Sequence, residues 1–176
     1  DYSGSRAVRL DASDLGRPLY ESMGFVAECA TERWFRAPGP AGFEAGPVGK
    51  LRWDRALDTE VFGADRTRLL EILARQEGAS VPGGYAFGRP GSNARYFGPC
   101  VAESVDAARR LMGWFVGRHS SEALFTDLFP HHLEAVAVAS EFGFVLARRL
   151  TRMVLKPVPV SMPDRRVIAT GSFSWG

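Results

Sequence analysis

The sequence predicts an α/β protein in which strands and helices alternate along the chain. Two observations lead to this prediction. Short apolar runs with strand-like alternation, such as 94–102 and 144–155, are separated by stretches of helical periodicity, such as 105–117. In addition, one order of elements occurs twice: a strand, a loop, a helix closed by Gly-Phe, and a long strand. With 45% hydrophobic and 24% charged residues, the 176-residue chain has the composition of a folded protein.

The N-terminal elements are short and well punctuated. Residues 7–10 are predicted to form a strand. The polar stretch 11–14 contains residues that can act as the N-cap of a helix over 15–23. Gly24 ends that helix, and 25–35 alternates as a longer strand. The segment 37–50 is rich in Pro and Gly and predicts a linker between two units.

The second part contains more elements. We expect a strand at 51–53, a helical region over 57–76, and two strands, 83–89 and 94–102, joined by a turn. Ser104 caps a helix over 105–117. A strand at 123–129, a helix at 133–142, a long strand at 144–155 and a final strand at 167–173 complete the chain.

An internal repeat connects the two parts. The segments 20–26 (YESMGFV) and 139–145 (ASEFGFV) align when one is shifted by 119 residues, which places Gly24 on Gly143. The same shift places Arg33 on Arg152. Because the order of elements around both segments also agrees, we interpret them as two copies of one unit.

Several classes of protein are disfavoured by composition. A net charge of +2, with basic and acidic residues interleaved, does not predict a nucleic-acid-binding surface. Cys29 and Cys100 are too few for a disulfide framework, and the adjacent His131 and His132 lack metal-ligand partners, so we expect a cytoplasmic protein with reduced thiols and no metal. No apolar run is long enough to span a membrane. The first five residues contain no initiator Met and are not typical of a signal peptide, which leaves open a start inside a longer protein.

The segment 8–25 (VRLDASDLGRPLYESMGF) resembles the C-terminal half of an acetyltransferase of the GNAT superfamily. In that family a strand ends near the acetyl-CoA thioester, and a helix with a Leu-Tyr pair follows and is closed by Gly-Phe. The region 57–153 resembles the second domain of tandem GNAT proteins; the matching stretches are 62–66, 84–86, 89–91, 98–99, 101–102, 143–144 and 152–153. The resemblance implies three parts: the tail of a first GNAT domain (1–36), a linker (37–50) and a second, degenerate GNAT-like domain (51–176).

The resemblance implies that Tyr20 is catalytic. It places the Tyr20 hydroxyl beside the CoA sulfur, where a phenol can protonate or stabilise the departing thiolate. Asp14, Gly16, Leu19 and Tyr20 would then lie along the bound acetyl-CoA. Without the resemblance, a tyrosine on this helix is more simply explained by a ring packed in the core with its hydroxyl at the surface. No general base can be named, and the family's phosphate-binding loop of the first domain would precede Asp1.

The second copy departs from the family's pattern at two places. The 119-residue shift places Ala139, which has no acidic proton, on Tyr20, and Ser140 points elsewhere on the helix. The family holds the CoA pyrophosphate on a Gly-rich loop at a helix N-terminus, but the matching loop 99–105 (PCVAESV) has no glycine and carries Glu103. Asp127 is open to interpretation as a general base, a polar ligand or, more simply, a loop cap. Arg148, Arg149, Arg165 and Arg166 are interpreted as solvated, with contacts to CoA phosphates as the alternative.

Together these features predict an α/β (α+β) fold of the GNAT type, with a mixed, largely antiparallel, bent sheet flanked by helices. The function implied is acetyl-CoA-dependent transfer of an acetyl group to a primary amine, on a small molecule or a peptide, with catalysis in the first copy. The alternative is a non-catalytic GNAT-like module that binds a partner or forms a dimer. Neither nucleic acid nor membrane is expected as a partner, and a homodimer is left open.

Overall fold

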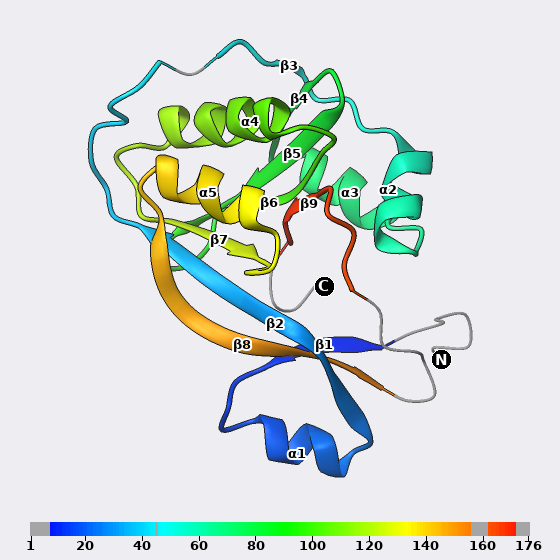
Figure 1. Ribbon diagram of the computed structural model, residues 1–176. Coiled ribbons are helices and arrows are strands. Elements are labelled where there is room, and N and C mark those ends of the chain that lie inside the picture. Colours follow the sequence, from blue (N-terminus) through cyan, green and yellow to red (C-terminus); the bar gives the residue numbers. More distant parts are fainter. Residues whose placement is uncertain (1–7, 45, 156–161, 172–176) are drawn as a thin grey trace.

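The computed structural model describes residues 8–44, 46–155 and 162–171, and these residues form one mixed sheet with helices packed on it (Figure 1). The strands are β1 (Arg9–Ala12), β2 (Phe25–Arg36), β3 (Gly49–Lys50), β4 (Glu77–Val81), β5 (Gly84–Arg89), β6 (Arg95–Ala102), β7 (Leu124–Leu128), β8 (Val145–Leu155) and β9 (Val167–Ala169). The helices are α1 (Arg17–Ser22), α2 (Arg55–Phe62), α3 (Thr67–Ala74), α4 (Val105–Arg118) and α5 (Leu133–Glu141).

The sheet is largely antiparallel, as predicted. Its order is β1-β8-β2-β7-β6-β5-β4-β3, with β9 paired to β6. Among the described strands, only β6 and β7 run parallel, and they are joined by the crossover helix α4. The ladder between β2 and β8 has two register irregularities, after Ala27 and after Arg33, and irregularities of this kind bend a strand pair. Figure 1 shows both strands curving away from the rest of the sheet.

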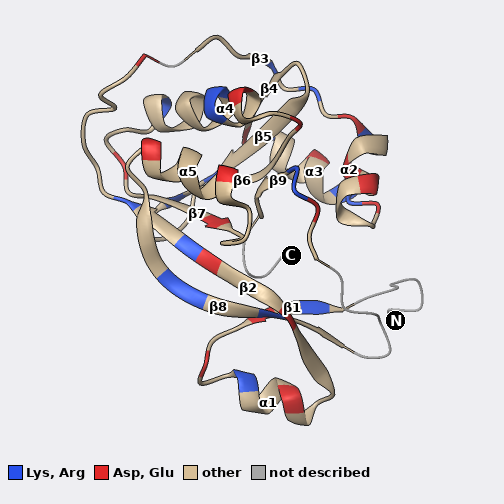
Figure 2. Cartoon of the chain, viewed as in Figure 1, with Lys and Arg blue, Asp and Glu red and all other residues tan. Residues whose placement is uncertain are grey.

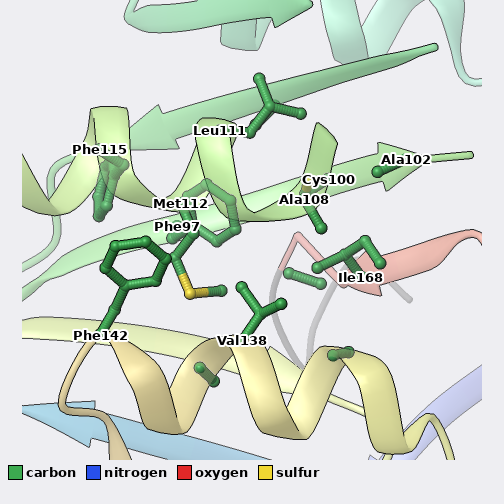
Figure 3. Close-up of a cluster of buried hydrophobic side chains, with 14 of the residues drawn as sticks. Phe97, Cys100, Ala102, Ala108, Leu111, Met112, Phe115, Val138, Phe142 and Ile168 are labelled. Atoms are coloured by element: carbon green, nitrogen blue, oxygen red, sulfur yellow. The ribbon is translucent and has the colours of Figure 1, made fainter. Parts of the chain in front are cut away.

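Helices cover the two faces of the central sheet. Side chains alternate along β5, so that Ala86 packs under α4 and α5 on one face, whereas Tyr85 and Phe87 pack against α2 and α3 on the other. Figure 3 shows the first of these two cores, in which Leu111, Met112 and Phe115 of α4 meet α5 and the sheet. Each core is therefore built from one sheet face and one pair of helices.

The N-terminal elements form a small lobe at the far end of the two long strands (Figure 1). We call β1, α1 and β2 the N-terminal unit, and β7, α5 and β8 the C-terminal unit. Ala12, Phe25 and Met153 are the buried residues of the small core in this lobe. Both units turn from helix to strand through a glycine with positive φ, Gly24 (91°) and Gly143 (80°), a conformation that glycine adopts without strain.

The segment between the two parts follows the surface of the second one. Arg36 is buried and donates hydrogen bonds to the carbonyl oxygens of Gly39, Pro40 and Phe142. Phe43 packs edge-on against Phe142, with ring centroids 4.6 Å apart. The Pro- and Gly-rich stretch is therefore attached to the α5 end of the molecule for part of its length.

Most predicted elements are present, and the differences have local causes. The helical region 57–76 is two helices, because the chain turns after α2 and Asp65 accepts a hydrogen bond from the Thr67 amide where α3 begins. The first strand of the second part is 49–50 rather than 51–53, and β4 was not predicted. α1 begins only at Arg17 and has no side-chain cap from 11–14, because Pro18 in its first turn sets the start. Residue 7 and residues 172–173 of two predicted strands lie outside the described residues.

The charges are dispersed. Figure 2 shows acidic and basic positions interspersed over the helices and the two long strands. No helix in the described part of the chain is long and apolar enough to cross a membrane. Within the same residues, no group of three potential ligands could hold a metal ion. His132 instead begins α5, and its ring nitrogens contact the carbonyl oxygens of Pro163 and Val167.

Leu111→Ala should destabilise the protein strongly, because Leu111 is fully buried between α4 and the sheet. Removing such a side chain leaves a cavity, and the expected loss is about 2–5 kcal/mol of unfolding free energy in urea titrations. Ile72→Ala is the matched control, because Ile72 is 52% exposed, and its loss should stay below about 1 kcal/mol. Equal losses for both variants would contradict the assignment of this core.

Candidate functional site

The N-terminal and C-terminal units are related by an exchange of their long strands. In the sheet order, β8 lies between β1 and β2 of the N-terminal unit, and β2 lies between β7 and β8 of the C-terminal unit. Each unit is thus completed by the long strand of the other. β2 and β8 pair antiparallel along their lengths, from Phe25–Leu155 to Phe35–Val145. The repeat found in the sequence is therefore also a repeat in space.

Two ion pairs mark this exchange at equivalent places. The Arg152 guanidinium donates from Nε and Nη2 to both carboxylate oxygens of Asp11, at 3.0 and 2.9 Å. The Arg33 guanidinium does the same to Asp127, at 2.8 and 2.7 Å. In both pairs the two residues are directly opposite each other on antiparallel strands. Bidentate pairs of this kind are strong and orient both partners.

The interpretation of Asp127 as a loop cap is wrong. Asp127 lies inside β7, with its side chain buried and both oxygens bonded to Arg33. Burial raises the pKa of the Asp127 carboxyl, and the hydrogen bonds from Arg33 oppose that rise. The carboxylate therefore joins two strands. The equivalent role of Asp11 was missed, although a signal existed: an aspartate precedes the helix by a similar distance in both copies.

The loop before α4 does not fit a phosphate. Its backbone amides bond within the chain: Ala102 N–H donates to the Arg166 carbonyl at 3.0 Å and Glu103 N–H to the Gly83 carbonyl at 2.8 Å. The Ser104 hydroxyl accepts from Ala107 N–H at 3.1 Å and so caps the helix. Glu103 and Asp106 add negative charge at this helix end, where an anion would otherwise bind.

Of the two arginines near this loop, Arg166 is paired with acids and Arg165 is exposed. A surface pocket beside the helix end is lined by Glu103, Asp164, Arg165 and Arg166. Arg166 bonds to Asp164 and to Glu60, and these hydrogen bonds raise the pKa of its guanidinium. Arg166 is thus in a local ion-pair network rather than simply solvated, whereas Arg148 and Arg149 are exposed, as expected.

The space between β6 and β7 is filled by the chain itself. The two strands pair through 95–97 and 124–126, and farther along β9 pairs with β6 at Cys100 and Val101. Thr170 then bridges to Asp127 of β7. Ile168 of β9 points into the core beneath α4 and α5 (Figure 3). A side chain on Gly98 would lie 2.2 Å from the Thr170 carbonyl oxygen, so the packing there is tight.

α5 carries no proton donor at the position that corresponds to Tyr20. Ala139 is fully buried in the core against α4. The neighbouring Ser140 hydroxyl donates to the Val136 carbonyl oxygen at 2.9 Å, so its proton is used within the helix. From the loop before α4 to α5, the C-terminal part therefore has neither the glycine-rich loop nor the tyrosine that the resemblance implies.

Tyr20 lies on α1 in the small lobe. Its ring is half-buried and packs edge-on against Phe25, with centroids 6.0 Å apart. Leu19 and Asp14 are exposed, and the Gly16 amide donates to Ser13 within the turn that begins α1. The four predicted residues thus lie on α1 and the turn before it, whereas Ala139 and Glu103 lie in the other part of the molecule. The roles of Asp14, Gly16, Leu19 and Tyr20 stay predictions.

Comparisons with known proteins agree with this fold. The profile of the family described as "Acetyltransferase (GNAT) domain" matches residues 55–168. A proposed acetyltransferase from Pyrococcus horikoshii superposes with a TM-score of 0.78 at 21% identity; the match covers 97% of this chain and 60% of that one. A GNAT-family acetyltransferase from Colwellia psychrerythraea superposes with a TM-score of 0.58 at 12% identity, covering 85% of this chain and 65% of that one.

A GCN5-related N-acetyltransferase from Anabaena variabilis gives a TM-score of 0.55 at 12% identity, covering 84% of this chain and 45% of that one. No curated protein matches the sequence. At these identities the solved structures show a shared fold. The chain spans less than two thirds of the length of each of these three structures.

Breaking the buried pair at the strand exchange should cost more than removing an exposed arginine. Both side chains of the Asp11–Arg152 pair are almost fully buried, so Arg152→Met leaves a buried carboxylate without its partner. The expected loss is about 3–5 kcal/mol of unfolding free energy, measured by urea titration. The control Arg148→Met removes an exposed arginine from the same strand and should change stability by less than about 1 kcal/mol. Asp11→Leu combined with Arg152→Met should recover part of the loss. A double variant less stable than Arg152→Met would contradict the assignment.

Proposed function

The chain belongs to the acetyltransferase (GNAT) domain family, and from this membership we propose that its protein transfers an acetyl group from acetyl-CoA to a primary amine. The proposal places catalysis in a first copy whose tail is the N-terminal unit. In this arrangement residues 1–36 end the first GNAT domain, 37–50 link the two, and 51–176 form the second, degenerate domain. The amine acceptor is a small molecule or a peptide.

One observation carries the proposal: the two repeated units differ at the helix position where the reaction needs a proton. The N-terminal unit has Tyr20 there, half-buried beside Phe25, and the C-terminal unit has Ala139, fully buried. A tyrosine hydroxyl can protonate the thiolate that leaves when an amine attacks a thioester, whereas an alanine cannot. Tyr20 is therefore the proposed general acid. Asp14, Gly16 and Leu19 are the proposed neighbours of the cofactor.

A second function is favoured by the C-terminal part alone. Glu103 and Asp106 at the start of α4, and β9 between β6 and β7, leave this part without a recognisable cofactor site. A chain with those features serves as a binding or dimerisation module. Both functions apply if the second domain supports an active first domain. If the native protein neither binds nor uses acetyl-CoA, only the function as a binding or dimerisation module remains.

Calorimetric titration of acetyl-CoA into the 176-residue chain should show no saturable binding. The reason is that the α4 end is occupied by acidic side chains and internal hydrogen bonds. The native protein, including any residues before residue 1, should bind acetyl-CoA in the same titration with a Kd of about 10 μM or below, which corresponds to roughly 7 kcal/mol or more. Saturable binding to the 176-residue chain at that level would contradict a closed second domain.

Tyr20→Phe should lower kcat of the native protein by about 100-fold or more and leave KM nearly unchanged, because the hydroxyl acts only as the thiolate leaves. Steady-state release of CoA measures both constants. Tyr96→Phe is the matched control, since Tyr96 lies in the C-terminal part and its hydroxyl makes one long contact, 3.4 Å, with Arg33. An unchanged kcat in Tyr20→Phe would remove the proposed acid.

A further inference from the structure

A surface cavity beside α4 is lined by basic side chains. Lys50, Arg52 and Arg110 border it, together with the end of β4, and its volume is about 610 Å³, a size at which pockets hold small molecules. The described residues that line it include no acid, whereas Glu103 and Asp164 accompany the arginines of the pocket at the start of α4. We call it the basic cavity.

Arg110 of α4 differs from the arginine that precedes it. Arg109 donates from Nε and Nη2 to both carboxylate oxygens of Glu141, at 2.7 and 3.0 Å. On Arg110, Nη2 donates to the carbonyl oxygen of Pro47, and Nε is buried without a hydrogen-bond partner among the described residues. The same side of the guanidinium thus meets one neutral acceptor where Arg109 meets a carboxylate. A buried N–H of a charged group is costly when it is unpaired, and an oxyanion is its strongest acceptor.

The other two cations stand on one backbone segment that is fixed by β4. The Ser80 hydroxyl accepts a hydrogen bond from Arg52 N–H at 3.2 Å and donates one to the Lys50 carbonyl oxygen at 2.8 Å. Leu51 lies between them in the sequence and packs into the core beside α2 and α3. Because side chains alternate along an extended segment, Lys50 and Arg52 share the opposite side. The two charges are therefore held on a defined backbone, although both side chains are exposed.

The positive charges of the basic cavity are not neutralised by the protein. Within the part of the chain that the structure describes, none of the three cations forms an ion pair. Asp106 stands four residues before Arg110, a spacing at which ion pairs form on helices, but Arg110 bonds to Pro47 instead. Lys50, Arg52 and Arg110 therefore repel one another, and an anion between them would replace this repulsion by attraction.

The basic cavity is separate from the cofactor position that the resemblance implies. That position is the loop before α4, whereas Arg110 lies in the second turn of the helix. Arg110 also lies on the flank that faces the segment 37–50, since a side chain on Gly46 would be 3.4 Å from Arg110 Cγ. Arg109 instead reaches α5 through Glu141. Figure 1 shows the segment 37–50 passing α4 before it reaches β3.

We propose that the basic cavity binds a small molecule through a phosphate group. Arg52 and Arg110 supply N–H groups in the planar fork that matches phosphate oxygens, and Lys50 supplies a compact point charge. Three positive charges exceed the single negative charge of a carboxylate, and they suit the charge of about −2 that a phosphate monoester carries near neutral pH. The inference does not depend on acetyl transfer.

Lys50 is a local reporter of binding, because residues 1–176 contain only one other lysine, Lys156. In the native protein, inorganic pyrophosphate at about 10 times its Kd should slow the labelling of Lys50 by an amine-reactive ester about 10-fold, since only the free site reacts. Peptide mass spectrometry measures the label, with Lys156, which lies outside the described residues, as the internal reference. Citrate, a carboxylate, should need about 10-fold higher concentrations. Absence of protection, equal protection of both lysines, or equal protection by citrate would overturn the proposal.

Substitutions of neighbouring arginines locate the site. Arg110→Gln should raise the pyrophosphate concentration that half-protects Lys50 by about 10-fold or more, because hydrogen bonds to a charged group are lost. Arg52→Gln should raise it about threefold without touching the contact between Arg110 and Pro47, so it decides the test if Arg110→Gln loosens the linker. Arg109→Gln is the matched control, because it removes the same charge from the adjacent position and should have less than about a twofold effect. No change in the first two variants, or an equal change in Arg109→Gln and Arg110→Gln, would also overturn the proposal.

These outcomes are separate from those of the proposed function. If pyrophosphate protects Lys50 while the native protein neither binds nor uses acetyl-CoA, the basic cavity stands and the proposed acetyl transfer fails. If acetyl transfer is measured while Lys50 is not protected, the reverse holds.

Discussion

The antiparallel pairing of β2 with β8 is the interaction on which the rest of the structure depends. It passes each long strand into the other unit, so neither unit has a complete sheet without its partner. The two ion pairs at the crossing, Asp11–Arg152 and Arg33–Asp127, each join a strand of one unit to a strand of the other, and both aspartates are buried. A buried charge without its partner is costly, so these pairs disfavour any shift of register. The exchange explains why a lobe as small as β1 and α1 keeps a defined place.

The C-terminal part keeps the architecture of the family while it departs from the pattern of cofactor-site residues that the resemblance implies. The strands, the crossover helix and the Gly-Phe turn are retained. Three local features distinguish this part: an alanine on α5, acidic residues at the start of α4, and β9 between β6 and β7. Each of them also stabilises the domain, through core packing, helix capping or additional strand pairing. The residues that depart from the family's pattern therefore also have structural roles.

The N-terminal unit has the opposite character. It is anchored through β2 and β8, but its helix and outer edge remain uncovered in the described residues. Residues in such a lobe have few buried contacts of their own, so their stability depends on what is added to them. Tyr20 packs against the small core of Ala12, Phe25 and Met153, so β8 helps to position it.

The sequence by itself determined the fold class, the order of most elements and the existence of the repeat. Periodicity, caps and the Gly-Phe turns are local signals, because each depends on residues that are close together in the sequence. The interpretation of Ala139 and Glu103 as departures from the family's pattern stays a prediction. Prediction from local signals failed where neighbours are distant in the chain: β4 was missed, the strand at 49–50 was displaced, and Asp127 was interpreted as a cap.

Only the tertiary structure decided which strands are exchanged, that Asp127 and Asp11 hold arginines of the opposite unit, and that β9 lies between β6 and β7. These contacts join residues that are 94 and 141 positions apart for the ion pairs. No local pattern specifies such partners, because pairing and burial are properties of the assembled sheet rather than of any one segment.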